Sequence, residues 1–477
     1  MPTKTKIIIS DTHIGAGGVQ YGNKLEDFIS DQEFYHWVHE LIEESVFNDL
    51  EMDMIINGDW IEFLQVPDAI TFDPAKIYAT DAYTSLTPEA ALQRLEIVHA
   101  GHPLVFQALA DFISPGPPCR TLTILYGNHD PELAYPAVQK RLCELLGACG
   151  YKQDLLTVGK RSYFKDGVYV EHGNAYTEKF NQFTDPDAPF DTHKPHLIER
   201  PPGSYVVTDY YNQIERERPW IDGVHPMIAL LFYALAFDPV FAMQALTAFL
   251  QAIPDLLSDV TLSASEKTQS DALLALLEKE DAQVLAERLI SSPAFATDFI
   301  DMMQQSLIAR GALPASSSSP ENMTVETLSS HTALLQARQI SEYYWQVLEE
   351  AAAVMAASLD ARAVLFGHIH EQVIKPLPSG AVYLNTGTWT WKANFTESPE
   401  EVWRDLMAHP EKYMNQRQLT YARVDVDANT GVTSARLLQA NDPPAPPAPP
   451  DPMPQPGLWA RFVMAVRKII AALTNWL

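Results

Sequence analysis

Short apolar runs rich in β-branched residues alternate, in the first part of the chain, with longer segments whose apolar residues recur at helical spacing. The short runs lie at residues 6–10, 53–57 and 121–126, and each ends at a polar loop. The longer segments, residues 26–48 and 88–113, have the apolar spacing of amphipathic helices. This alternation predicts a layered α/β fold whose chemistry lies at the ends of the strands.

The strand pattern resumes after residue 160 and again near the end of the chain. Strands are predicted at residues 162–164, 168–171, 363–366 and 381–384, followed by a hairpin over residues 418–438. We therefore expect a core in two parts, residues 1–173 and residues 361–440.

Residues 174–360 separate these two parts and are rich in helical periodicity, which is clearest at residues 272–291, 294–310 and 342–357. We interpret the segment as a mostly helical insert. Its candidate role is that of a lid over the site. Its apolar runs at residues 227–237 and 240–253 are interrupted by Asp238 and Pro239, and neither run reaches the roughly 20 residues of a membrane span. A buried or interface-lying helix pair is expected there.

The end of the chain changes character. Nine prolines between Pro443 and Pro456 predict a stiff linker over residues 441–457. Residues 458–477 then place apolar residues such as Trp459 and Ile470 on one helical face and Arg461 and Lys468 on the other, without an acidic residue. This pattern predicts an amphipathic helix that lies in a membrane surface. The alternative is a helix that docks on the protein itself or makes a dimer contact.

Composition narrows the range of partners. The chain has 61 acidic and 33 basic side chains, a formal net charge of −28, which opposes binding along a nucleic-acid backbone. Its three cysteines have no metal-type spacing and are expected to be reduced. No secretory signal is visible at the start of the sequence, so we expect a cytoplasmic protein that is peripherally associated with a membrane.

Five short polar motifs follow predicted strands. They are Asp11-x-His13, Gly58-Asp59-x-x-Glu62, Gly127-Asn128-His129-Asp130, His172-Gly173-Asn174 and Gly367-His368-Ile369-His370. Each motif alone is common loop chemistry, but five in this order, all at strand ends, are hard to obtain by chance. Hydrolysis of a phosphoester near neutral pH needs an activated water and cations that balance phosphoryl charge, and Asp, Asn and His side chains hold such cations.

With these motifs the chain resembles the calcineurin-like metallophosphoesterase family, over residues 6–172 and about 363–391. The resemblance implies a four-layer α/β/β/α sandwich that binds two divalent metal ions. It assigns one ion to Asp11, His13 and His370, and the other to Asn128, His172 and His368, with Asp59 bridging both. The ligand types suit Mn²⁺, Fe or Zn²⁺ better than an all-oxygen Mg²⁺ site, and we expect Mn²⁺.

Two further residues have roles that the resemblance implies. His129 is expected to approach the leaving-group oxygen as an acid or hydrogen-bond donor, and Asp130 to fix its orientation. Many family members carry Asp-Arg where this chain has Glu62 and Phe63, so the usual phosphate-binding arginine is absent. The Gly-Asp-x-x-Glu form is similar to the UDP-2,3-diacylglucosamine hydrolase branch, although His129, Asn174 and the long insert depart from that branch.

Other polar and aromatic residues are expected at the surface or in the core rather than in a catalytic role. His193 and His196 are expected to be surface histidines rather than ligands of a third metal ion. Charged and polar residues at the start of the insert could reach a substrate but are more often solvated; they are Lys179, Asn181, Arg200 and Arg216. Trp389 and Trp391 are expected in the core.

The sequence therefore predicts a dinuclear metal-dependent phosphoesterase. Its expected substrate is a phosphate or pyrophosphate ester, of a lipid or lipid-linked nucleotide at a membrane surface. A soluble nucleotide or phosphoprotein substrate is the alternative. A catalytically inactive scaffold is a third hypothesis, and the complete set of seven ligand positions together with His129 argues against it.

Overall fold

The first of two β-sheets contains the strands that the N-terminal sequence predicts. In the computed structural model its strand order is β11-β10-β1-β2-β3-β4. The strands are β1 (Lys4–Ile9), β2 (Glu51–Asn57), β3 (Arg120–Leu125), β4 (Leu156–Lys160), β10 (Thr420–Asp427) and β11 (Gly431–Gln439). Strands β1 to β4 are parallel, and Ile9 is aligned with Ile56 on β2. Because parallel strands end at the same edge of a sheet, the loops that follow β1, β2 and β3 meet there.

The second sheet is mixed and has the strand order β5-β6-β7-β9-β8. Its strands are β5 (Ser162–Lys165), β6 (Val168–Glu171), β7 (Ala363–Phe366), β8 (Gln372–Pro376) and β9 (Val382–Thr386). Strands β6 and β7 are parallel neighbours although the whole insert separates them in sequence. The fold therefore joins the two predicted parts of the core side by side.

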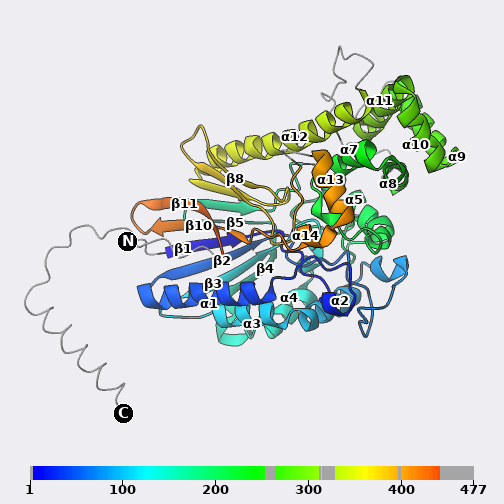
Figure 1. Cartoon of the computed structure of the whole chain (residues 1–477). Helices are drawn as coiled ribbons and strands as arrows, with labels where there is room; N and C mark the ends of the chain where they lie inside the picture. Colours follow the sequence, from blue (N-terminus) through cyan, green and yellow to red (C-terminus); the bar gives the residue numbers. More distant parts are fainter. Residues whose placement is uncertain are drawn as a thin grey trace, which may run out of the picture. The chain divides into compact units, whose positions relative to one another are not determined.

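Alternation along β1 shows how the layers pack. Ile8 lies in a buried cluster with residues of both sheets, including Leu365 and Leu384. Ile7 and Ile9 point to the opposite face, where they pack with helical residues such as Trp37. Helices on that face are α1 (Asp31–Asn48), α2 (Pro88–Gly101), α3 (Pro103–Phe112) and α4 (Pro136–Leu145) (Figure 1). The α/β expectation is confirmed.

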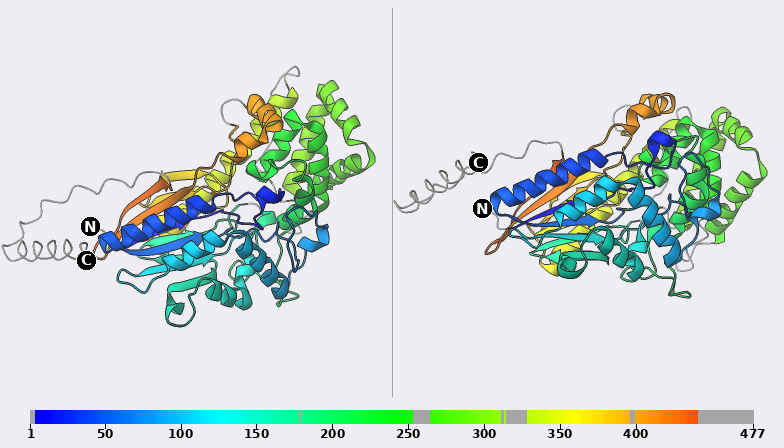
Figure 2. Two further views of the ribbon diagram at one scale, coloured as in Figure 1. Left: turned by 60° about the horizontal axis from the view of Figure 1, so that its bottom comes forward. Right: turned by 90° about the horizontal axis from the view of Figure 1, so that it is seen from below.

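The outer face of the second sheet is covered by α12 (Leu328–Leu359), whose buried Ala352 and Ala356 join the same cluster as Phe366 and Tyr383. The other helices of the insert gather at one end of the two sheets (Figures 1 and 2). They are α5 (Pro202–Val206), α6 (Asn212–Ile214), α7 (Met227–Phe237), α8 (Pro239–Ala252), α9 (Ala264–Lys279), α10 (Ala282–Ser291) and α11 (Pro293–Ala309). Two more helices, α13 (Pro399–Ala408) and α14 (Pro410–Met414), follow β9.

Short helical turns connect these elements. They are η1 (Val19–Tyr21), η2 (Thr80–Tyr83), η3 (Pro131–Ala134), η4 (Gly150–Leu155), η5 (Lys179–Asn181), η6 (Val207–Tyr211) and η7 (Ile221–Gly223).

The structure describes residues 4–177, 179–252, 264–310, 313, 328–395 and 399–440. Met1–Ala440 forms one compact unit that includes the insert. Within the described part of the chain, each helix is too short or too polar to cross a membrane. The predicted linker, residues 441–457, and the predicted amphipathic helix, residues 458–477, lie outside the described residues.

Several local predictions differ from the structure. The helix predicted over residues 88–113 breaks into α2 and α3 at Pro103, which cannot donate a helical hydrogen bond. The pattern at residues 272–291 divides into α9 and α10, because the Asp281 side chain caps α10 by accepting from the Gln283 backbone N–H. Strands β4 and β8 were not predicted; they contain Gly159 and Pro376, which weaken a strand signal.

The expected reduced state of all three cysteines is also wrong. Cys143, near the end of α4, forms a disulfide with Cys149, and their Cα atoms are 5.4 Å apart. The chain turns back between them at Gly147, which has a φ of +57°. Cys119 is free. The spacing of the two cysteines, six residues apart in the sequence, does not by itself indicate that the chain turns back between them.

Candidate metal centre

The five motifs meet where the parallel strands of both sheets end. Asp11 and His13 follow β1, Asp59 follows β2, and Asn128 to Asp130 follow β3. His172 follows β6 of the second sheet, and His368 and His370 follow β7. Hydrogen bonds join the two sheets at this point, since the His368 backbone N–H donates to the Asp11 carboxylate at 3.0 Å. The site is thus assembled from both parts of the core.

Five of the proposed ligands adopt backbone conformations that side chains normally avoid. Nine non-glycine residues in the described ranges have positive φ, and among them are Asp11 (51°), His13 (45°), Asp59 (47°), His368 (72°) and His370 (53°). Such conformations cost energy and concentrate at functional sites. Their clustering at one edge of the sheets points to a site whose geometry is maintained by the surrounding fold.

The glycines of two motifs leave room for these side chains. A Cβ atom on Gly127 would lie 2.2 Å from the Asp59 Oδ1 atom, and one on Gly367 would lie 2.5 Å from Asp11 Oδ2. Any side chain at either position would displace a carboxylate. The glycines are therefore required by close approach of the backbone to the acidic residues.

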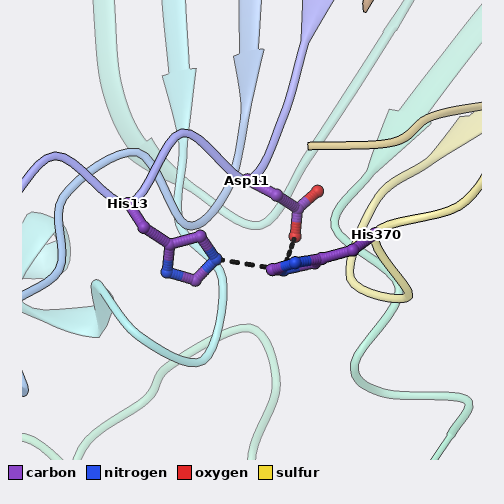
Figure 3. A group of neighbouring side chains, drawn as sticks. All are labelled: Asp11, His13 and His370. Atoms are coloured by element: carbon purple, nitrogen blue, oxygen red, sulfur yellow. Dashed lines mark hydrogen bonds and ion pairs between the residues drawn. The ribbon is translucent and has the colours of Figure 1, made fainter. Parts of the chain in front are cut away.

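The first group of candidate ligands is Asp11, His13 and His370 (Figure 3). The Nε2 atoms of His13 and His370 are 3.1 Å apart, and the His370 Nε2 atom is 3.3 Å from Asp11 Oδ1. The His13 Nδ1 atom lies 2.7 Å from Glu62 Oε2, so this nitrogen carries the proton and Nε2 keeps its lone pair. Two imidazole nitrogens and a carboxylate oxygen therefore converge on one point.

The second group is Asp59, His172 and His368, with Asn128 beside them. The His172 Nδ1 atom donates to the Asn57 carbonyl at 3.0 Å, which leaves its Nε2 lone pair free. That buried Nε2 atom and the buried Asn128 Oδ1 atom have no hydrogen-bond partner. Buried polar atoms are normally paired, so these lone pairs fit a bound cation. A metal ion suits the donor set.

Asp59 lies between the two groups. Its Oδ2 atom is 3.0 Å from His172 Nε2 and 3.9 Å from His13 Nε2. Its Oδ1 atom accepts the backbone N–H of His129 at 2.9 Å. Burial would raise the pKa of Asp59, but protonated histidines beside it, His172 first, hold it well below its usual range, and a cation that replaces the His172 proton would act in the same direction. The carboxylate is therefore ionised and oriented as a shared ligand would be.

Glu62, rather than Asp130, is the partner of His129. The His129 Nδ1 atom lies 2.7 Å from Glu62 Oε2, the same oxygen that His13 contacts. The predicted pairing of His129 with Asp130 is therefore wrong. The Asp130 carboxylate is buried and instead accepts backbone N–H groups of Gly127 at 2.6 Å and of Trp60 at 2.8 Å. It joins the loops after β2 and β3 to each other.

The charges around His129 favour its protonated form. Burial alone would lower the pKa of His129, but the carboxylates of Glu62 and Asp59 raise it to about 10. Burial would raise the pKa of Glu62, and the charge of His129 brings it below its usual value. Buried Glu62 and half-buried His129 form an ion pair, which favours the protonated form of His129. In the sequence, the signal for Glu62 is its position three residues after Asp59, in the motif Asp59-x-x-Glu62.

A cavity opens beside these residues and is lined by both the core and the insert. Core residues at its wall include His13, Asp59, Asn128 and His129, and insert residues include Asn181, Asp222 and His225. No lysine or arginine lines it among the described residues. Sequence reasoning missed Asp222 and His225, because neither belongs to a recognisable motif.

The other candidates of the sequence are accounted for. The Arg200 and Arg216 side chains donate to the backbone carbonyls of Tyr83 and Tyr78. Asn181 alone of the four insert candidates lines the cavity. His193 and His196 are exposed, and Trp389 and Trp391 are buried, as predicted.

Three carboxyl groups, two buried and one half-buried, lie near the cavity in addition to the metal-centre residues. Asp27, Glu215 and Asp222 bring their oxygens within 4.8 Å of one another. The Gln65 amide donates to Glu215 at 2.7 Å and to Asp222 at 2.8 Å. Burial, followed by the charge of Asp222, raises the pKa of Glu215 well above its usual value. The three residues are too widely spaced in the sequence for a motif to reveal them.

Comparisons with known proteins give little further information. No family model matches the chain, and no curated protein matches it. Among solved structures the chain is similar to a dimetal phosphatase from Danio rerio, with 11% identity over 92% of this chain and 100% of that chain, at a TM-score of 0.28. The function of this protein is therefore inferred from its own residues and their geometry.

Proposed function

We propose that this protein is a metal-dependent phosphoesterase with two divalent cations in the centre described above. The observation that carries the proposal is the convergence of two groups of metal-type ligand atoms on either side of Asp59, among which the buried His172 Nε2 and Asn128 Oδ1 atoms have no hydrogen-bond partner. Asp11, His13 and His370 would hold one ion, and Asn128, His172 and His368 the other. Mn²⁺ is the proposed metal, with Fe or Zn²⁺ as alternatives, because imidazole and oxygen ligands suit all three.

The residues of the centre would have different chemical roles. When bound, two such cations balance phosphoryl charge and make a nucleophile available from water. Asp59, whose carboxylate lies between the two groups, would be available as a ligand to both cations. His129, held by Glu62, donates a proton to the leaving-group oxygen. Packing of both sheets around Ile8, with helices outside each sheet, supports the four-layer α/β/β/α arrangement for this fold.

The proposed substrate is a phosphate or pyrophosphate ester of a lipid or of a lipid-linked nucleotide. Support comes from the Gly-Asp-x-x-Glu form of the second motif and from the amphipathic pattern of residues 458–477. The protein would then act at a membrane surface. The insert would act as a lid, an idea supported by the presence of Asp222 and His225 in the cavity wall. A soluble nucleotide or phosphoprotein remains the alternative substrate.

The proposed function is tested by metal removal and reloading. Protein stripped with a chelator should lose turnover of nitrophenyl mono- and diesters, and Mn²⁺, Zn²⁺ or Fe²⁺ should restore it with two ions bound per chain. The same preparations are then assayed on lipid phosphates, nucleotide–lipid pyrophosphates and soluble nucleotides. Active protein without bound metal, or metal-loaded protein without activity on any ester, would refute the proposal.

The membrane role is tested by truncation after Ala440, where the compact unit ends. The shortened protein should keep its metal ions and its turnover of small esters, since all proposed ligands precede residue 441. Binding to anionic liposomes and turnover of a bilayer-embedded substrate should fall. Replacing Arg461, Arg467 and Lys468 with Glu should weaken liposome binding in a salt-dependent way. Equally poor sedimentation of full-length and truncated protein with liposomes would favour a soluble substrate.

A further inference from the structure

Four histidine rings contact one another in a row across the metal centre. The ring centroids of His129 and His13 are 4.8 Å apart, those of His13 and His370 are 5.0 Å apart, and those of His370 and His225 are 3.8 Å apart. The two inner rings belong to the first group of proposed ligands. The two outer rings do not, and they enter from opposite parts of the chain, His129 after β3 and His225 from the insert.

A close contact with the core positions the segment that carries His225. Turn η7 (Ile221–Gly223) precedes His225, and a Cβ atom on Gly223 would lie 2.0 Å from ring carbons of Trp391. The Ala393 backbone N–H donates to the Gly223 carbonyl at 2.8 Å. Trp391 is itself buried, and its Nε1–H donates to Asp27 at 3.1 Å. Because only glycine fits beneath this fixed indole, the segment has little freedom to carry His225 away from the cavity.

The described part of the cavity wall contains no lysine or arginine side chain that could stabilise a phosphoryl group, and His225 can provide a hydrogen-bond donor there. A phosphoryl group carries charge spread over its oxygens during transfer, and donors placed at those oxygens stabilise it. His225 is the histidine that the insert contributes to this wall. It is half-buried and lies against the ring of a proposed ligand.

We propose that His225 is a second active-site histidine that is not a metal ligand, and that its ring N–H donates to a phosphoryl oxygen of the substrate. The role is distinct from that of His129, which faces the leaving group. This inference rests on the proposed phosphoesterase function. It makes the insert part of the catalytic machinery, because the core alone lacks this donor.

Replacement of His225 by alanine tests the proposal. In the Mn²⁺-loaded protein, kcat/KM for a nitrophenyl phosphoester should fall about 10²- to 10³-fold, as for loss of one oxyanion donor. Metal content should stay at the wild-type level, and inhibition by inorganic phosphate should weaken. Added imidazole should restore part of the activity, which a purely structural role would not allow. The matched control is His196→Ala, an exposed loop histidine, which should behave as wild type.

A second variant addresses positioning without touching the imidazole. Gly223→Ala should displace the segment from Trp391 and lower kcat/KM in the same direction, but imidazole should not rescue it as well, because His225 is still present. His225→Asn, which keeps an N–H donor, should lose less activity than His225→Ala and serves where the alanine variant does not fold. Thermal melting checks folding of each variant.

The outcomes separate this inference from the proposed function. A His225→Ala protein with wild-type kcat/KM and wild-type phosphate inhibition would overturn the role of His225. So would loss of one metal ion in that variant, because His225 would then be a ligand. If wild-type protein binds metal but hydrolyses no ester, the proposed function fails. Calorimetric binding of inorganic phosphate to the metal-loaded protein then still tests the contact, and equal affinity of wild type and His225→Ala overturns it.

Discussion

Asp59→Asn should abolish hydrolysis and release metal from the protein. The change is nearly isosteric, but it replaces one carboxylate oxygen by an NH₂ group that cannot coordinate a cation. The Oδ2 atom lies 3.0 Å from His172 Nε2 and faces both ligand groups, so both ions should bind more weakly. Activity should fall by more than about 100-fold, the upper range for residues that only orient a ligand. Elemental analysis and ester turnover measure the two effects together.

Asp49→Asn is the matched control for this variant. Asp49 also has a left-handed backbone, with a φ of 52°, but it is exposed at the end of α1. Asparagine tolerates that conformation as well as aspartate does, so a backbone effect would appear in both variants. Retention of full activity and two metal ions in Asp59→Asn would exclude Asp59 as the shared ligand.

His129→Ala should slow turnover by roughly 10²- to 10⁴-fold, the range expected for a lost general acid. Metal should stay bound, because the His129 side chain contacts Glu62 and His13 rather than occupying a proposed ligand position. Bound cations would lower its pKa from the value of about 10 that its carboxylate neighbours produce, bringing it nearer to neutral pH. The ion pair with Glu62 keeps the ring oriented throughout.

The leaving group distinguishes this role from a structural one. A nitrophenolate departs without much help from a proton, so the loss in His129→Ala should be smaller for nitrophenyl esters than for alkyl esters. Glu62→Gln should show a weaker form of the same pattern, since the ring keeps a hydrogen-bond acceptor but loses the charge. Equal losses on both ester types would argue against proton donation to the leaving group.

Much of the core and of the candidate centre could be predicted from the sequence, because short stretches of sequence contain the patterns that indicate both. A buried strand followed by a polar loop can be recognised in a short window, and this was enough to place Asp11, Asp59 and Asn128 after strands. Parallel pairing then brings the ends of β1, β2 and β3 to one edge whatever lies between them. The metal roles of these residues stay predictions until metal is measured.

Tertiary structure decided the pairings between loops. Asp130 follows His129 directly, yet its carboxylate turns inward because several backbone N–H groups there need a buried acceptor. Glu62, 67 positions away from His129, takes its place. His225 reaches His370 because Gly223 packs under Trp391, a contact that joins residues from the insert and the core. The sequence by itself determined which residue types stand at strand ends. Which of those side chains meet depends on packing between distant segments, and no local pattern records it.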